Sequence, residues 1–444
     1  MQPTRQLEVR SQGIVFAGTA LLLLVIVALA ALQLTDPASP NRPGTPTAFA
    51  ALTPITGTPV APTAAPTAVV EASPTVRSSD SPPPIEDRDK WGQVIEIITE
   101  NPEAQMYRGS LARTGAYTGD PISDRPPVAW AMPLNDENFS APSVAGDRLV
   151  IGGNDDKLKC IDAGSGELIW EFETGDDISS SPAIAANRVF VGSFDGNFYA
   201  LDIKNGRRKW RFETAQPIHS SPAVDGSIVY FGGYDRIVYA LSVLDGTVVW
   251  TAITGDKVQS SPAVSGDLVA IGSDDGYLYG LDRLTGKRLW RVDTGAPVTS
   301  TPAIADGIVY VASSSGVVYA IGAESGEVVW TYDTGSAITF SSTAVAENTV
   351  VVGTDAGVLV ALRAQSGKER WTFAAEAEIR SSAIIVGGVV YAGSYDENLY
   401  AIDLATGDRV WSTDRGGAVG SPLFAGDTIY ISLNSGELQA LRPE

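Results

Sequence analysis

The side chains that most often carry chemistry are scarce in this chain of 444 residues, which holds a single histidine, His219, and a single cysteine, Cys160. One copy of each excludes an intrachain disulfide, a cysteine-rich zinc site, and a metal site or proton relay built from two histidines. His219 as a general base has no partner that the sequence identifies. We therefore expect a protein that is not an enzyme, with no catalytic residue and no metal site.

Side chains that could hold a ligand occur instead at one position of a repeating pattern, three residues before the proline of a Ser-Ser-Pro motif or of its variants. This position holds Phe139, Ser179, His219, Gln259, Thr299, Phe340, Arg380 and Val419. A position needed only for packing would hold similar residues in every repeat. The variation makes six of them candidates for binding a small ligand or a partner's side chain: Phe139, His219, Gln259, Thr299, Phe340 and Arg380. A solvated funnel without a ligand is the alternative.

The repeat that positions these residues is marked by tryptophans spaced 40 residues apart, with a single spacing of 41. They are Trp130, Trp170, Trp210, Trp250, Trp290, Trp330, Trp371 and Trp411, and a glycine lies four residues before each except Trp130. Each unit also contains four short stretches rich in β-branched and aromatic residues, separated by turn signals such as Asp-Gly. In the fourth unit the predicted strands are 260–264, 268–273, 277–281 and 288–293.

A period near 40 residues with four strands predicts a β-propeller. The first type of strand starts eight times, and the last unit ends before any tryptophan strand. The tryptophan strand at 128–134 has no unit in front of it. Pairing these two incomplete parts closes a ring of eight blades without an open seam. The predicted fold class is all-β, an eight-bladed β-propeller with four-stranded blades, preceded by one N-terminal transmembrane helix and a Pro-rich linker.

The recurring residues are expected to serve packing. A ligand touches one site and not eight equivalent ones, and a buried indole contributes at most ~4–6 kcal/mol by removing its surface from water. We therefore expect the eight tryptophans to pack between blades. Cys160 falls at a position that holds alanine or glycine in the other units, which favours a buried space-filling residue over a reactive thiol. The Asp-Gly pairs could suggest calcium loops, but they are ordinary hairpin turns.

The net charge is −21, from 31 Lys and Arg against 52 Asp and Glu. Such a surface repels phosphate backbones, so we expect no nucleic-acid partner. The same charge favours basic partners.

The part of the chain before the repeats is predicted to be a membrane anchor and a stalk. Residues 14–34 form a run of 21 residues without a charge and with only Gln33 as a strongly polar group. Arg5 and Arg10 precede it, which favours a transmembrane helix with a cytoplasmic N-terminus at 1–13. A cleaved signal peptide is the alternative, because residues 28–30 resemble a cleavage site. The further predicted boundaries are a Pro/Thr/Ala-rich linker at 35–90, a lead-in segment at 91–127 and the propeller at 128–444. We expect a single-pass membrane protein whose propeller is extracytoplasmic, periplasmic or at the cell surface.

The stretch from Gly280 to Trp290 resembles the repeat of pyrroloquinoline-quinone (PQQ)-type propellers, Ala-Leu-Asp-x-x-Thr-Gly-Lys-x-x-Trp, nearly throughout. Residues 401–411 are close to this motif, and 240–250 and 320–330 are degenerate copies. The resemblance covers about residues 105–444. It implies a PQQ-like repeat β-propeller, similar to the propeller subunit of the outer-membrane β-barrel assembly machinery and to quinoprotein propellers. In that family the tryptophan packs between blades.

The resemblance leaves the function divided. Quinoprotein dehydrogenases hold PQQ and calcium in the funnel and typically carry adjacent cysteines, which a chain with one cysteine lacks, so we expect no cofactor. The assembly subunit is a lipoprotein scaffold, and here no cysteine follows the apolar run. We expect a monomeric, membrane-anchored scaffold that binds protein or peptide partners in the cell envelope. A small-ligand sensor of the envelope and, less favoured, a PQQ-dependent dehydrogenase are the alternatives.

Overall fold

The computed structural model describes residues 105–134 and 140–443. The predicted N-terminal helix, the Pro-rich linker and Phe139 lie outside these two ranges. Within them, no helix has the length and apolar character needed to span a bilayer.

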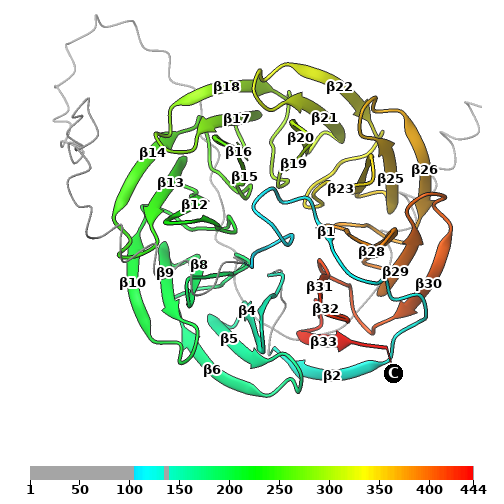
Figure 1. The fold of residues 1–444 in the computed structure, drawn as a ribbon, viewed down its shortest axis with the longest axis horizontal. Coiled ribbons are helices and arrows are strands. Elements are labelled where there is room, and N and C mark those ends of the chain that lie inside the picture. The colour runs from blue at the N-terminus through cyan, green and yellow to red at the C-terminus, as the bar shows by residue number, and fades with distance from the viewer. Residues whose placement is uncertain (1–104, 135–139, 444) are drawn as a thin grey trace, which may run out of the picture. The chain divides into compact units, whose positions relative to one another are not determined.

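The strands form eight sheets, arranged as four-stranded blades around a central axis, and one of these sheets gains a short fifth strand (Figure 1). Blade 1 contains β3 (Ser143–Ala145), β4 (Arg148–Gly152), β5 (Lys157–Asp162) and β6 (Leu168–Glu173). Blade 2 contains β7 (Ala183–Ala185), β8 (Arg188–Gly192), β9 (Asn197–Asp202) and β10 (Arg208–Glu213). Blade 3 contains β11 (Ala223–Asp225), β12 (Ile228–Gly232), β13 (Ile237–Ser242) and β14 (Val248–Ile253). Blade 4 contains β15 (Ala263–Ser265), β16 (Leu268–Gly272), β17 (Tyr277–Asp282) and β18 (Arg288–Asp293).

The other four blades repeat this order. Blade 5 contains β19 (Ala303–Ala305), β20 (Ile308–Ala312), β21 (Val317–Gly322) and β22 (Val328–Asp333). Blade 6 contains β23 (Ala344–Ala346), β24 (Thr349–Gly353), β25 (Val358–Arg363) and β26 (Glu369–Ala374). Blade 7 contains β27 (Ile384–Val386), β28 (Val389–Gly393), β29 (Asn398–Asp403) and β30 (Arg409–Asp414), and the short β1 (Ala116–Tyr117) pairs in parallel with β27. Blade 8 contains β31 (Leu423–Ala425), β32 (Thr428–Leu433), β33 (Glu437–Leu441) and β2 (Val128–Pro133).

Blade 8 joins the two ends of the propeller, as the repeat count predicted. The early strand β2 pairs antiparallel with the last strand β33, with Trp130 opposite Ala440 and Pro133 opposite Glu437. The ring therefore has eight blades and no blade lacks its outermost strand. Both predictions, the blade number and the closure by the first tryptophan strand, are confirmed.

The innermost strands are shorter than the sequence analysis predicted. In blade 4 the first strand was expected at 260–264, but β15 begins at Ala263. The Ser-Ser-Pro residues before it bond to the neighbouring blades instead, because proline has no N–H for a ladder. Backbone amides of Ala141, Ser181, Ser221, Thr301, Ser342 and Ser382 donate to the hydroxyl of the equivalent serine one blade further on, at 2.9–3.0 Å. The serines thus link blades around the channel.

The tryptophans lie where each blade meets the next. The indole N–H of Trp250 in blade 3 donates to the carbonyl of Arg283 in blade 4 at 2.9 Å, and its ring lies against Gly286. Equivalent bonds lead from Trp130, Trp170, Trp210, Trp290, Trp330 and Trp371 to Ala163, Ile203, Val243, Ala323, Ala364 and Leu404. Trp411 in blade 7 donates to Ile122, so the lead-in segment replaces the turn that blade 8 lacks.

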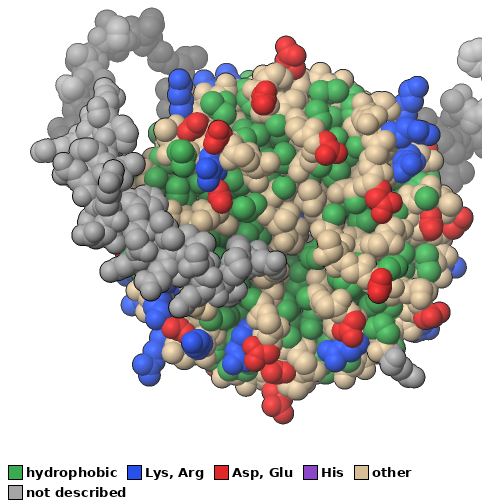
Figure 2. Space-filling view, viewed as in Figure 1, with side chains coloured by type: hydrophobic (Ala, Val, Ile, Leu, Met, Phe, Trp, Pro, Cys, Tyr) green, Lys and Arg blue, Asp and Glu red, His purple; other side chains and the backbone are tan. Residues whose placement is uncertain are grey.

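The second and third strands of the blades are almost entirely buried, whereas the outermost strands alternate between exposed and buried residues. Neighbouring blades cover both faces of the middle strands, which explains their continuous apolar sequences. Cys160 belongs to this layer and is buried. On the face shown in Figure 2, charged side chains gather toward the rim and few lie over the centre.

Candidate functional site

The lead-in segment crosses the central channel and closes it at one end. In Figure 1 this segment is the cyan chain inside the ring. The carbonyls of Leu111, Ala112, Thr114 and Gly115 accept backbone N–H groups from the innermost strands of blades 4, 5, 6 and 7, each at 2.8 Å, and Gln105 bridges to Ile184 in blade 2. The segment therefore joins five of the eight blades at their inner edges.

Arg113 anchors this segment from within the channel. Its side chain has no solvent exposure. The guanidinium donates to the carbonyls of Pro262 at 3.1 Å, Ser221 at 3.1 Å, Pro222 at 2.6 Å, and Tyr107. Burial lowers the pKa of Arg113 to about 9, which leaves it protonated at neutral pH. A buried charge of this kind is stable only where its donors are satisfied, and here backbone carbonyls of blades 3 and 4 satisfy them.

A second buried guanidinium lies beside the first. Arg108 donates to the carbonyl of Arg113 at 2.9 Å, and to those of Ser342 and Thr343 in blade 6. Burial lowers the pKa of Arg108 as well. In the described part of the chain, neither arginine forms an ion pair with a carboxylate. The base of the channel is therefore held by charge-assisted bonds to main-chain oxygens.

Above this base the channel forms a cavity of about 500 Å³ that is open at one mouth. Seven of the eight residues at the variable position before the Ser-Ser-Pro motif line it: Ser179, His219, Gln259, Thr299, Phe340, Arg380 and Val419. Tyr107 of the lead-in segment also lines it. The structure thus brings the predicted site residues together around one cavity, except Phe139, which lies outside the described residues. Whether they bind a ligand stays a prediction.

One side of the cavity is aromatic. The ring of His219 lies 6.1 Å from that of Phe194 and 6.4 Å from that of Tyr234, measured between ring centroids. Tyr234 donates to the side chain of Gln259 at 3.0 Å, and the amide of Gln259 donates to Asp274 at 2.6 Å. These bonds fix the orientation of the Gln259 side chain and leave the aromatic faces as the main surface offered on this side.

The opposite side carries a cation. The guanidinium of Arg380 stands 5.3 Å above the ring of Tyr395 and 3.7 Å from the carboxylate of Asp355. Phe340, at the mouth, is 49% exposed, which is high for a phenylalanine. This side therefore combines an exposed apolar ring with a guanidinium that is already partly neutralised by Asp355.

Burial favours the neutral form of His219. Burial lowers its pKa below the ordinary value, and this outweighs the carbonyl of Gln259, 3.4 Å from Nδ1, and the charge of Asp274, which both raise it. A neutral imidazole flanked by rings serves as a flat apolar surface. In the described residues no carboxylate or nucleophile is bonded to it, so the geometry offers no acid–base pair.

We expect the imidazole of His219 to titrate below 6.5, its ordinary pKa. Because the unfolded chain then takes up the proton more readily, the free energy of unfolding falls as the pH drops through and below this value. NMR of this single imidazole, folded and in urea, measures both pKa values directly. His219→Gln should remove that part of the acid sensitivity. A folded midpoint at or above 6.5 contradicts the prediction.

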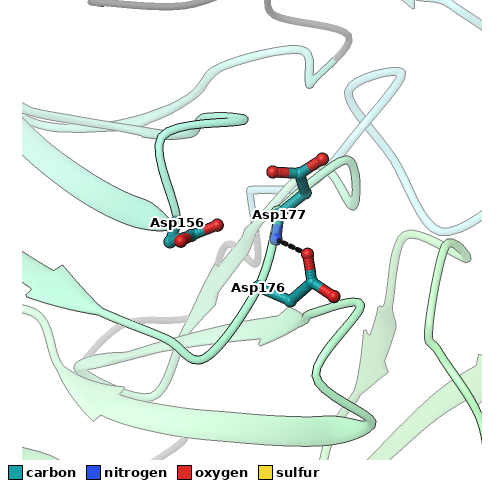
Figure 3. A group of neighbouring side chains, drawn as sticks. All are labelled: Asp156, Asp176 and Asp177. Atoms are coloured by element: carbon teal, nitrogen blue, oxygen red, sulfur yellow. Dashed lines mark hydrogen bonds between the residues drawn. The ribbon is translucent and has the colours of Figure 1, made fainter. Parts of the chain in front are cut away.

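Three carboxylates near the cavity lie close enough to suggest a cation site. Ligand oxygens of Asp156, Asp176 and Asp177 all fall within 4.8 Å of one another, and the backbone N–H of Asp177 donates to Asp176 at 2.9 Å (Figure 3). Asp176 is exposed and only Asp177 lines the cavity. Exposed carboxylates often cluster without binding an ion, and no other feature of the described residues points to one here.

Sequence reasoning missed a second variable position that lines the cavity. It follows the second strand of each blade, and its lining members are Asn154, Phe194, Tyr234, Tyr395 and Asn434. These residues recur at the same spacing of about 40 as the tryptophans, yet they differ from blade to blade. The criterion that selected the first position would have selected this one as well.

Comparisons with known proteins show the fold. A family model described as the β-propeller of the beta-alanine-activating enzyme matches residues 157–349. No curated protein matches the chain. Among solved structures, BamB from Moraxella catarrhalis is 18% identical, with 71% of this chain and 97% of that chain covered and a TM-score of 0.62. A quinohemoprotein alcohol dehydrogenase from Comamonas testosteroni is 15% identical, with coverages of 76% and 80% and a TM-score of 0.67.

The chain thus has the fold of a β-propeller and resembles BamB and the quinohemoprotein alcohol dehydrogenases in structure, in agreement with the resemblance of its repeat motif. A computationally designed protein is as similar, at 18% identity, coverages of 70% and 98% and a TM-score of 0.63. A likeness at this level of identity concerns the fold, and function has to be argued from the site.

Proposed function

We propose that the chain is a non-catalytic, membrane-anchored scaffold that binds protein or peptide partners on the extracytoplasmic side, with the mouth of the funnel as a binding surface. One observation carries the proposal. The funnel is closed at its base and ends in a mouth whose residues vary between blades, while the residues that pack the blades repeat. The fold likeness to BamB supports a scaffold, and the anchor rests on the apolar run at residues 14–34.

The chemistry of the mouth suits a segment of a partner protein. Phe340 presents an exposed ring and Arg380 a guanidinium, and the aromatic side at His219 lies across the same cavity. Aromatic and arginine side chains are the residues that most often dominate protein interfaces. A loop that inserts one apolar and one acidic side chain would meet a complementary group for each.

The lining does not fit PQQ with calcium. Calcium takes six to eight oxygen ligands, usually with several carboxylates, whereas Asp177 is the only carboxylate among the described residues that line the cavity. The single cysteine is buried in β5 and is not one of the lining residues. The proposal therefore includes no quinone and no step that depends on one.

Site-specific photo-crosslinking in the native membrane tests the proposal. A photoreactive residue in place of Phe340 should give a discrete protein adduct, and the same residue at Val410, which is 43% exposed on β30, serves as the control. Adding Arg380→Ala should reduce the adduct about fivefold or more. Equal labelling at both positions, or none at Phe340, contradicts a partner at the mouth. Dye reduction after addition of PQQ and calcium would overturn the non-catalytic part.

A small-ligand sensor is the second candidate, because a cavity of about 500 Å³ lies within the range of small-molecule sites. A thermal-shift screen of envelope metabolites separates the two candidates. A ligand that raises the melting temperature of the native chain, and no longer does so in His219→Ala, would favour the sensor. A protein adduct at Phe340 without any such ligand favours the scaffold.

A further inference from the structure

The outermost strand of blade 3, β14, has an unprotected edge. Its sequence from Val248 to Ile253 contains no charged residue and no proline. Among the eight outermost strands only β2 also lacks a charge, and β2 ends in Pro133. Val248, Val249 and Ile253 are 49%, 39% and 77% exposed. Soluble proteins normally protect such edges with charges or proline, because an open edge pairs readily with another strand.

The two neighbouring blades carry an unusual concentration of positive charge. Residues 204–211 in blade 2 hold five Lys or Arg and no acidic residue, and residues 283–291 in blade 4 hold four and no acidic residue. Six of these cations are exposed and form no ion pair within the described residues: Lys204, Arg207, Arg208, Arg211, Lys287 and Arg288. In a chain of net charge −21 this region reverses the overall sign.

These basic segments border blade 3 directly. The indole of Trp210 in β10 donates to the carbonyl of Val243, directly after β13, at 3.0 Å. On the other side, Trp250 of β14 donates to the carbonyl of Arg283 in blade 4 at 2.9 Å. The uncharged edge therefore lies between two basic flanks that the tryptophan contacts hold in place.

We propose that β14 binds an extended, acidic segment of a partner protein, which adds a fifth strand to blade 3. The proposal deepens the scaffold function and rests on it. Side chains of an added strand would point alternately toward blade 2 and toward blade 4. Acidic residues on the blade 4 side would thus meet Arg288 and Arg291, which lie opposite Leu281 and Tyr279 on the face of β18 toward blade 3. Main-chain bonds to β14 would supply affinity independent of sequence.

The charges around β14 differ between its two ends. Basic residues lie at the start of β10 and β18, whereas Glu213, Asp256 and Asp293 lie at or just beyond the ends of β10, β14 and β18. The acidic residues of the partner therefore belong at the end that covers Val248, and uncharged β-branched residues belong opposite Ile253. A second copy of this chain fits poorly, because pairing two β14 edges would bring basic flanks together.

Peptide binding by the full chain in detergent tests this proposal. The probes are fluorescent ten-residue peptides of alternating Val and Thr that carry three Glu at the N-terminal or the C-terminal end, and matched peptides with Lys. We expect one of the Glu peptides to bind, more weakly at high salt. Ile253→Lys should weaken this binding about tenfold, and Arg288→Glu with Arg291→Glu should remove it. Val329→Lys on β22, a site 54% exposed, is the matched control and should have no effect.

Other outcomes overturn the proposal. They are equal binding of Glu and Lys peptides, equal loss in Val329→Lys, or no binding at all. A dimer abolished by Ile253→Lys would assign the edge to a second copy, and binding of anionic vesicles that depends on the arginines but not on Ile253 would assign it to a membrane. These results are independent of the adduct at Phe340, so the scaffold proposal and this one can fail separately.

Discussion

Replacing Arg113 by alanine is expected to lower the free energy of unfolding by ~3–5 kcal/mol. The substitution removes donors from four carbonyls, those of Tyr107, Ser221, Pro222 and Pro262. It also leaves a void where a fully buried side chain stood. Removing a buried charge recovers some desolvation energy, but here the charge is well satisfied and the carbonyls it leaves behind are not, so the loss should dominate.

Chemical denaturation of the full chain measures this change. Lys368→Ala provides the control, since Lys368 is exposed and makes no side-chain bond within the described residues. Its effect should stay within ~0.5 kcal/mol. Arg113→Lys should recover only part of the loss, because an ammonium keeps the charge but cannot direct donors to several carbonyls in the planar arrangement of a guanidinium.

Hydrogen exchange distinguishes a loosened lead-in segment from general destabilisation. The amides of Val264 and Ile304 donate to Leu111 and Ala112, directly before Arg113. In Arg113→Ala these two amides should lose protection first, while amides shared by β17 and β18 should change only with global stability. Uniform loss across blade 4, or stability equal to that of the unaltered chain, would show that Arg113 does not anchor the segment.

The eight-bladed ring could be predicted from the sequence because its determinants repeat. Each blade must present a large ring to the next blade and a small residue to receive it, so Trp250 and Gly286 recur with a fixed period. The closure of the ring could be predicted by counting strands. The first tryptophan strand has no unit in front of it, and the last unit has no tryptophan strand. β2 and β33 do pair in this way.

The closed base of the funnel could not be predicted in the same way. The acceptors of Arg108 and Arg113 are main-chain carbonyls, which every residue has, so the blades bear no sequence signal of the contact. β1 is only two residues long and pairs through its backbone. The sequence therefore predicted a lead-in segment but not that it crosses the channel.

Of the two variable positions that line the cavity, the sequence predicted one. The varying position that holds His219 and Arg380 was found because the residues before and after it repeat. The position that holds Tyr234 and Tyr395 varies as strongly, but it follows a buried strand and borders the turn to the next strand. Some turns of a propeller border the mouth of the channel and others lie at the rim. Which of the two applies to a given turn depends on the position of its strands in the blade and not on its local sequence.

Replacing Trp250 by alanine is expected to lower the free energy of unfolding by ~3–5 kcal/mol. The indole is 7% exposed, donates to Arg283 of blade 4 and lies 5.7 Å from the ring of Tyr230. Alanine therefore leaves a cavity between blades 3 and 4 and one carbonyl without its donor. Trp250→Phe should cost less, because most of the ring contact remains and the N–H bond alone contributes ~1–2 kcal/mol. Denaturant titration measures both, with Val249→Ala on the same strand, 39% exposed, as the control.

A double-mutant cycle with Gly286 shows whether the loss arises between the blades. A methyl group at Gly286 would lie 2.5 Å from Cε3 of Trp250, and φ is +69° there. Gly286→Ala should cost ~2–4 kcal/mol. Gly266→Ala, at φ +57° with open space around it, should cost only the backbone strain of ~1–2 kcal/mol. Once Trp250→Ala has removed the ring, Gly286→Ala should cost no more than Gly266→Ala. An unchanged cost of Gly286→Ala in that background would mean that the indole does not press on the next blade, and docking between blades would then have to rest on other contacts.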